Sequence, residues 1–233
     1  MSSASTGVIR SPNIWDHPAI YELENRAVDP DGRLWAAMRD RHDWISQAVL
    51  DIGCGTGYYL PKFAADAAEV IGVEPHPPLL RGAQCRIASS RQIRVLPGTA
   101  QKLPVPDASI DVAHARWSYF FGPGCEPGLA ELNRVMRRGG TAFIIDNDLT
   151  RSTFGRWCRR AWPSSHPTRV EAFFSSHGWS RTSIDMGWRF SSRQELESVV
   201  RIEFTPNFAA QFIAEHSSLD VDYAVNLWHK QWP

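Results

Sequence analysis

The sequence predicts an α/β protein whose mostly parallel β-sheet is covered by helices on both faces. Short apolar segments alternate with helical patterns between residues 48 and 145, and strands that are apolar on both faces are typical of parallel sheets. A glycine-rich turn, DIGCGTG at residues 51–57, directly follows the first of these strands. Glycine lets the backbone approach a ligand closely, and the N–H groups of such a turn then face that ligand. We therefore expect a ligand site at the carboxyl ends of the strands.

Length, charge and cysteine usage are typical of an ordinary soluble enzyme with one globular domain. The chain has 233 residues, and its 25 Lys and Arg residues equal its 25 Asp and Glu residues. This balance argues against nucleic acid and anionic membranes as partners. The cysteines at positions 54, 85, 125 and 158 form no Cys-x-x-Cys pair, which indicates free thiols in a reducing compartment. With no apolar run near the ~18 residues of a membrane span, we expect a cytoplasmic protein, with homodimer formation left open.

The N-terminal quarter precedes the alternating pattern. Residues 1–12 are Ser-rich without the apolar core of a secretory signal, and we expect them to be disordered. Helices are predicted over residues 13–26 and 32–46, so residues 13–47 form a helical unit before the main domain at 48–233.

The main domain opens with the alternating elements. The predicted strands are residues 48–52, 70–73, 93–96, 110–113 and 141–145. The predicted helices between them are residues 58–67, 79–88 and 125–138, the last stopped by Gly139 and Gly140.

The last third is less regular. Residues 149–167, rich in Arg, Trp and Pro, are interpreted as an insertion after the fifth strand. A capping-box pattern, Ser192-x-x-Glu195, predicts the start of a helix that buries Leu196, Val199 and Val200. The other predicted elements are helices at 168–177 and 208–215 and strands at 183–190 and 221–227.

The glycine spacing restricts the choice of ligand. A dinucleotide fingerprint, Gly-x-Gly-x-x-Gly, requires a third glycine at position 58 or 60, where Tyr58 and Leu60 stand. The pattern Asp-x-Gly-x-Gly-x-Gly at 51–57 instead resembles motif I of the class I S-adenosylmethionine-dependent methyltransferases. Residues 98–104 (GTAQKLP), 106–112 (PDASIDV) and 131–140 (ELNRVMRRGG) resemble further stretches of the same family, in the same order.

The resemblance covers residues 48–146 and points to the broad small-molecule branch of that family. It implies a Rossmann-like, seven-stranded, mostly parallel sheet of order 3-2-1-4-5-7-6 with an N-terminal helical lid. It also implies S-adenosylmethionine as cofactor, released as S-adenosylhomocysteine.

Glu74 ends the second strand, where a carboxylate can accept hydrogen bonds from both ribose hydroxyls. Thr99 replaces the acid that in the family often contacts the adenine amine, so this contact is weaker here. The full set of expected cofactor-binding residues is Tyr21, Asp51, Gly53, Cys54, Gly55, Glu74, Pro75, Thr99, Ala100, Gln101 and Ala115.

Acceptor-binding residues are expected after the fourth and fifth strands and in the lid. The aromatic run at 116–121 can stack a flat or apolar substrate, although it can equally cover the sheet edge. The expected substrate-binding residues are Trp15, Arg116, Trp117, Tyr119, Asp146 and His166.

No catalytic base is assigned, because an in-line methyl transfer needs mainly alignment and exclusion of water. His114 is interpreted as a buried structural histidine. Asp146-Asn147-Asp148 resembles the ligands of metal-dependent catechol methyltransferases, but His114-Ala115-Arg116 stands where the companion acid belongs. No metal is therefore expected.

The sequence thus predicts a methyltransferase that acts on an O, N or C atom of a small organic molecule, such as a secondary metabolite. Two alternatives stay open: a nucleotide-dependent oxidoreductase on the same kind of sheet, and an S-adenosylmethionine-binding protein without turnover.

Overall fold

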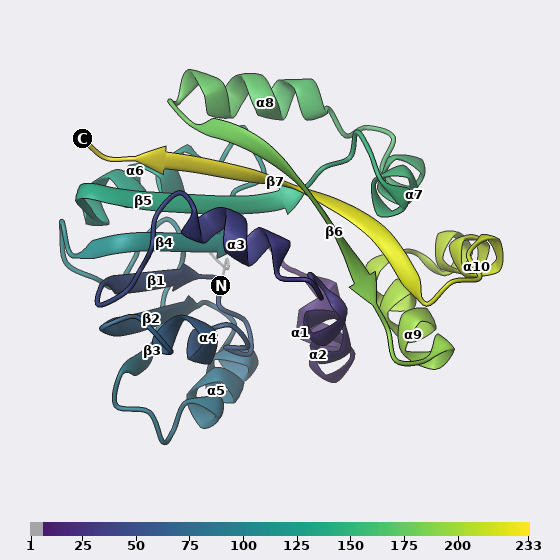
Figure 1. Cartoon of the computed structure of the whole chain (residues 1–233), viewed down its shortest axis with the longest axis horizontal. Helices are drawn as coiled ribbons and strands as arrows, with labels where there is room; N and C mark the ends of the chain where they lie inside the picture. Colours follow the sequence, from purple (N-terminus) through teal and green to yellow (C-terminus); the bar gives the residue numbers. More distant parts are fainter. Residues whose placement is uncertain (1–6) are drawn as a thin grey trace, which may run out of the picture.

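Seven strands form a single sheet of order β3-β2-β1-β4-β5-β7-β6, with helices on both faces (Figure 1). The computed structural model describes residues 7–233. All neighbouring pairs from β3 to β5 are parallel, whereas β7 runs antiparallel to both β5 and β6. The predicted fold class and strand order are confirmed.

The strands are β1 (Ala48–Ile52), β2 (Glu69–Glu74), β3 (Ile93–Pro97), β4 (Ile110–Arg116), β5 (Met136–Asn147), β6 (Ser180–Arg189) and β7 (Asp220–Gln231). The helices are α1 (Pro12–Asp16), α2 (Pro18–Ala27), α3 (Arg33–Arg39), α4 (Leu60–Ala64), α5 (Pro77–Arg86), α6 (Glu126–Val135), α7 (Thr153–Ala161), α8 (Pro167–Ser176), α9 (Arg193–Glu203) and α10 (Pro206–Glu215).

Two hydrophobic layers fill the space between the sheet and its helices. One layer joins α3, α4, α5, α7, α9 and α10 to the first face of the sheet. The other joins α6 and α8 to the second face. Because side chains alternate along a strand, Val112 of β4 belongs to the first layer and Ala113 to the second. This alternation decides which strand residues can reach the site.

The N-terminal segment differs from the expectation. Of the segment predicted to be disordered, residues 1–6 lie outside the described residues. Residues 7–11, called the strap below, run in a defined path, and Pro12 already begins α1. The carbonyl of Gly7 accepts a hydrogen bond of 2.6 Å from Gln101 Nε2, and Arg10 pairs with Asp16 at 2.8 Å. These contacts hold a segment whose composition alone predicted no structure.

The predicted helices before β1 are shorter than expected. The helix at 13–26 is broken at His17, because the following Pro18 disfavours helical backbone at its predecessor. Helix α3 ends at Arg39 instead of continuing to residue 46. His42 there turns its ring toward Thr141 Oγ1 (2.9 Å) and the side chain of Gln47 (2.8 Å), which ties this turn to the end of the sheet.

Two later boundaries also differ. Helix α6 ends at Val135 instead of continuing to residue 138. Met136 is not part of the helix; it starts β5 and pairs with Ile110 of β4. The segment at 149–167 contains α7, whose N-cap Ser152 accepts a hydrogen bond from Gly155 N. The predicted capping box is confirmed at α9, where Ser192 Oγ accepts from Glu195 N.

Within residues 7–233, no helix combines the length and the apolar character needed to cross a bilayer.

Candidate functional site

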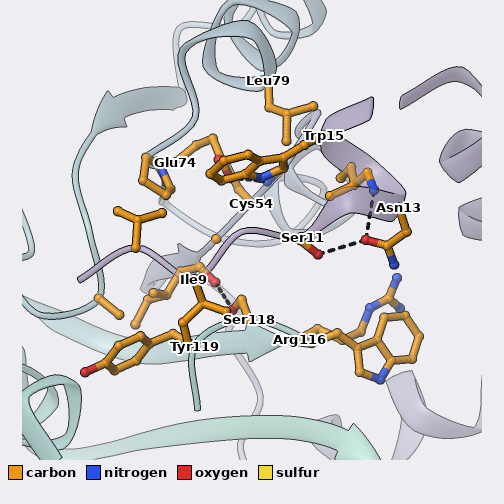
Figure 2. A pocket seen from close by; sticks show the side chains of 18 of the residues that line it. Ile9, Ser11, Asn13, Trp15, Cys54, Glu74, Leu79, Arg116, Ser118 and Tyr119 are labelled. Atoms are coloured by element: carbon orange, nitrogen blue, oxygen red, sulfur yellow. Dashed lines mark hydrogen bonds between the residues drawn. The ribbon is translucent and has the colours of Figure 1, made fainter. Parts of the chain in front are cut away.

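A cavity of about 500 Å³ lies at the carboxyl ends of the central strands. Its size falls within the roughly 300–1,000 Å³ typical of ligand pockets. Figure 2 shows Glu74 and Trp15 on one side, Ser118 and Tyr119 on the other, and the strap between them. The strap and α1 therefore form one wall of this pocket.

The glycine turn forms its floor, and its three glycines, Gly53, Gly55 and Gly57, all have left-handed backbone. Gly53 has φ +73°, and a Cβ added there would lie 2.5 Å from Ser118 Cβ. Gly55 has φ +56°, and a Cβ added there would lie 2.8 Å from Ile14 Cδ1. The absence of side chains thus lets both the loop after β4 and helix α1 approach the turn. Cys54 lines the same floor.

Glu74 is buried at the end of β2 and holds the glycine turn. Its Oε2 accepts a hydrogen bond of 2.9 Å from Gly55 N, and its Oε1 accepts one of 2.8 Å from His76 N. Burial raises the pKa of Glu74, while these two N–H donors act in the opposite direction. Each carboxylate oxygen keeps a further lone pair for a ligand hydroxyl. Pro75 follows it in the wall.

The loop after β3 supplies another wall through Thr99, Ala100 and Gln101. Gln101 uses its amide for the strap, as described above. Arg134 of α6 fixes the rest of this loop, because its guanidinium donates to the carbonyls of Leu103 and Val105, both at 2.9 Å. The residues of α6 that resemble the family therefore have a structural role: they hold the loop after β3 and do not line the pocket themselves.

Asp51 and His114 form a buried polar pair at the base of the pocket. His114 Nδ1 lies 2.8 Å from Asp51 Oδ1, and the His114 ring packs edge-on against Phe63. With the Nδ1 proton donated to the carboxylate, Nε2 is the acceptor nitrogen. His114 is buried, as predicted, yet it also lines the pocket.

The loop after β4 carries Arg116, Trp117 and Tyr119 into the pocket wall. Trp117 and Tyr119 are non-glycine residues with φ of +49° and +54°, a conformation that costs energy. A hydrogen bond of 3.0 Å from Trp117 N to Ile145 O holds the first of them. Within residues 7–233, the buried indole N–H of Trp117 has no acceptor.

Helix α2 meets the C-terminal third of the chain at an acid pair. The carboxyl groups of Glu24 in α2 and Glu203 in α9 are neighbours, and Asn13 Nδ2 donates to Glu203 Oε1 at 2.6 Å. Burial raises the pKa of both carboxyls, and Glu203 raises that of Glu24 further. Tyr21, next to this pair, lines the pocket, and burial raises its pKa as well.

Most of the predicted site residues line this one cavity. Those placed there are Tyr21, Asp51, Gly53, Cys54, Gly55, Glu74, Pro75, Thr99, Ala100, Gln101, Trp15, Arg116, Trp117 and Tyr119.

Three predicted site residues do not line the pocket. Ala115 and Asp146 point to the opposite face of the sheet, the face covered by α6 and α8. There Asp146 accepts hydrogen bonds from Asn226 Nδ2 (2.8 Å) and Trp228 Nε1 (3.2 Å). His166 is exposed at the N-cap of α8, which packs on that same face. The structure therefore places Asp146 and His166 away from the pocket in which we expected them, and the Ala115 side chain is turned away from that pocket.

The Asp-Asn-Asp segment at the end of β5 makes internal hydrogen bonds. Asp148 accepts from Ser183 Oγ (2.6 Å) and Thr150 Oγ1 (2.6 Å). Among the described residues, no group of three or more His, Cys, Asp or Glu side chains is arranged to hold a metal ion.

Several pocket residues were not predicted. They include Val8, Ile9, Asn13, Ile14, Asn25, Tyr58, Tyr59, Leu79, His114, Ser118, Phe121, Trp162, Ile202 and Glu203. Ser118 and Phe121 lie in the aromatic run that the sequence highlighted. Trp162, Ile202 and Glu203 reach the pocket only through tertiary packing, for which the sequence carries no local signal.

Comparison with known proteins finds a family model that is similar to the central part of the chain. Residues 50–144 match the family model described as "Methyltransferase domain". The chain is 30% identical over 125 residues to sterol 4-C-methyltransferase strm-1 of Caenorhabditis elegans, covering 49% of this chain and 37% of that protein. It is 33% identical over 102 residues to the demethylmenaquinone methyltransferase of Thermus thermophilus, covering 42% of this chain and 46% of that protein. The chain thus spans less than half the length of these curated relatives.

The fold is also that of a solved structure. The YcgJ protein of Bacillus subtilis superposes with a TM-score of 0.61 at 18% identity, covering 85% of this chain and 98% of that one. At this identity the likeness concerns the fold alone.

Proposed function

We propose that residues 50–144, which match the methyltransferase family model, form a class I S-adenosylmethionine-dependent methyltransferase domain, and that the protein methylates an O, N or C atom of a small organic molecule. The observation that carries the proposal is one cavity that joins the glycine turn and Glu74 to the loop after β4. Such a cavity brings a methyl donor and an acceptor into one enclosure.

The donor half fits S-adenosylmethionine by its chemistry. Glu74 supplies carboxylate oxygens for a ribose diol, and the turn at Gly53 and Gly55 leaves room for backbone approach. Leu79 and Trp15 supply apolar surface beside Glu74 for a flat base (Figure 2). Bound there, S-adenosylmethionine supplies an electrophilic methyl group on a sulfonium sulfur.

The acceptor half is aromatic and polar. Tyr21, Arg116, Trp117, Trp162 and Glu203 line it. Their role is to orient the acceptor, exclude water and hold a proton at a defined atom. His114, whose Nδ1 faces Asp51, offers Nε2 as a proton acceptor for substrates that lose a proton.

The relatives support a small-molecule acceptor. The two curated relatives are named for a sterol and for demethylmenaquinone, which are small organic molecules rather than macromolecules. The equal numbers of acidic and basic residues agree with such a substrate in a reducing, cytoplasmic setting.

Two experiments test the proposal. Calorimetric titration with S-adenosylhomocysteine and with NAD separates the donor assignment from an oxidoreductase, and tight NAD binding without affinity for S-adenosylhomocysteine would overturn it. Transfer of label from methyl-labelled S-adenosylmethionine to a metabolite panel then separates an enzyme from a binding protein without turnover. Incorporation into any acceptor supports the enzyme.

A further inference from the structure

A second cavity of about 240 Å³ lies behind the first and shares a wall with it. The residues that line both cavities are Asn25, Tyr58, Tyr59, His114 and Arg116. The methyl-donor contacts proposed above do not use this second cavity. Its position beside Arg116 places it next to the acceptor half of the pocket.

Arg116 stands in the shared wall with most of its hydrogen-bonding capacity unused. Its guanidinium carbon lies 3.8 Å from the centre of the Tyr59 ring and 4.4 Å from that of Trp117. Its guanidinium donates a hydrogen bond to a neutral oxygen, Asn25 Oδ1, at 3.2 Å. Within residues 7–233, no carboxylate oxygen lies within 4.0 Å of it. Since arginine has five N–H donors, several remain for an anion.

A second cation borders the same cavity. Lys62 Nζ lies 4.1 Å from the centre of the Trp35 ring, and in the described part of the chain it has no carboxylate partner. The Trp35 and Tyr59 rings are stacked with their centres 6.4 Å apart. One continuous aromatic surface therefore carries both cations, each held over a ring by cation–π attraction.

The acid that lines this second cavity is already engaged in hydrogen bonds. Asp29 lines the cavity, but its carboxylate accepts from Arg33 N (2.8 Å) and Leu34 N (3.2 Å) at the start of α3. Burial lowers the pKa of Lys62, the charge of Asp29 acts in the opposite direction, and the charge of Arg116 lowers the pKa further. Two like charges at one small cavity repel each other, and an anion between them would remove that cost.

We propose that this second cavity is an anion-binding chamber that holds the carboxylate or phosphate group of the methyl acceptor. Arg116 contacts the anion from the shared wall and Lys62 from the rim. The proposal rests on the proposed function, and it narrows the acceptor class to organic acids or phosphate esters. The part of the acceptor to be methylated then extends past Arg116 into the larger pocket.

Equilibrium binding of matched aromatic probes tests the chamber. Benzoate and phenyl phosphate carry the two anions, and benzamide is the neutral counterpart of benzoate. We expect an anionic probe to bind at least tenfold more tightly than benzamide. The tighter of benzoate and phenyl phosphate identifies the anion. Lys62→Met should weaken anion binding at least tenfold and Lys62→Arg should restore it, whereas Lys102→Met, at an exposed lysine of another loop, should change nothing.

The decisive outcomes are distinct. Equal affinity for benzamide and both anions, or unchanged anion affinity in both Lys62→Met and Arg116→Met, would overturn the chamber. Lys62 is exposed at the rim, so its variants keep the test valid even if Arg116→Met fails to fold. Titration of the same preparations with S-adenosylhomocysteine reports separately on the donor site. If S-adenosylhomocysteine did not bind, the result on anion binding would still stand.

Discussion

Asp51 and His114 face each other across two neighbouring strands, with 2.8 Å between carboxylate and imidazole nitrogen. They are register partners of β1 and β4, so both side chains leave the sheet on the same face. Both are buried beneath the pocket. A buried polar pair of this kind is stable only while each partner has the other.

The two residues should therefore behave as a unit in unfolding experiments. Asp51→Leu leaves the imidazole nitrogen without a partner and should cost about 1–3 kcal/mol of unfolding free energy. His114→Phe should do the same for the carboxylate. The double variant should be more stable than the sum of the two losses predicts. Urea denaturation of the four proteins measures the coupling, and simple additivity would contradict it.

Gly55→Val should abolish cofactor binding. The residue has φ +56°, and a Cβ would meet Ile14 Cδ1 at 2.8 Å, so the variant strains the turn and fills the approach to it. Calorimetry with S-adenosylhomocysteine measures the effect. Gly82→Ala is the matched control, because the space around that helical glycine is open. The affinity of this variant for S-adenosylhomocysteine should stay at the wild-type value.

Glu74→Gln should weaken S-adenosylhomocysteine binding by about 1.5–3 kcal/mol, the usual value of a hydrogen bond to a charged group. The glutamine amide keeps the shape of the carboxylate but replaces one acceptor oxygen by an NH₂ group. That NH₂ group faces the N–H donor of His76 and cannot accept its hydrogen bond. Glu69→Gln, at the exposed start of the same strand, serves as control. Affinity within twofold of wild type for Glu74→Gln would refute the ribose assignment.

Asp146 should make the folded protein less stable as the pH rises toward neutrality. Burial raises its pKa to about 7, above the unfolded value of about 3.9. Between these values the folded protein keeps a proton that the unfolded chain releases, so its contribution to stability is present below about pH 4 and is lost as the pH approaches 7. The effect is on the order of a few kcal/mol, at about 1.4 kcal/mol per pKa unit.

Asp146→Asn should flatten this dependence, because asparagine can keep the acceptor toward Asn226 and Trp228 without titrating. Urea unfolding between about pH 5 and about pH 8 compares the slopes. Asp148→Asn is the opposite case. The hydrogen bonds from Ser183 and Thr150 lower the pKa of Asp148 despite its burial, so that variant should lose stability at neutral pH. If the unfolding free energy of wild type and of Asp146→Asn changed with pH at the same slope, Asp146 would not be the source of the pH dependence.

The central sheet was predictable because its signals are local. Apolar strands, the glycine turn and the acid at Glu74 each occupy a few consecutive residues, and the resemblance to a family supplied the strand order. The capping box at Ser192 and Glu195 was predictable for the same reason, since a cap involves residues three apart.

The remaining site residues depend on strand register and tertiary packing. Asp146 was expected at the pocket because it ends an apolar strand, but alternation along β5 turns it toward Trp228. The same alternation brings His114 to the pocket face and takes Ala115 away from it. Glu203 enters the site because α9 packs against α2, a contact between residues almost 180 positions apart that no sequence window contains.

The strap has a consequence for the timing of catalysis. It crosses the mouth of the pocket between Glu74 and Ser118, and its hydrogen bond from Gln101 is a single neutral one, worth roughly 1 kcal/mol. We therefore expect a spent donor molecule to leave when this segment moves aside, and a fresh one to enter by the same route. We expect the exchange of donor, rather than the displacement at the methyl carbon, to set the turnover number.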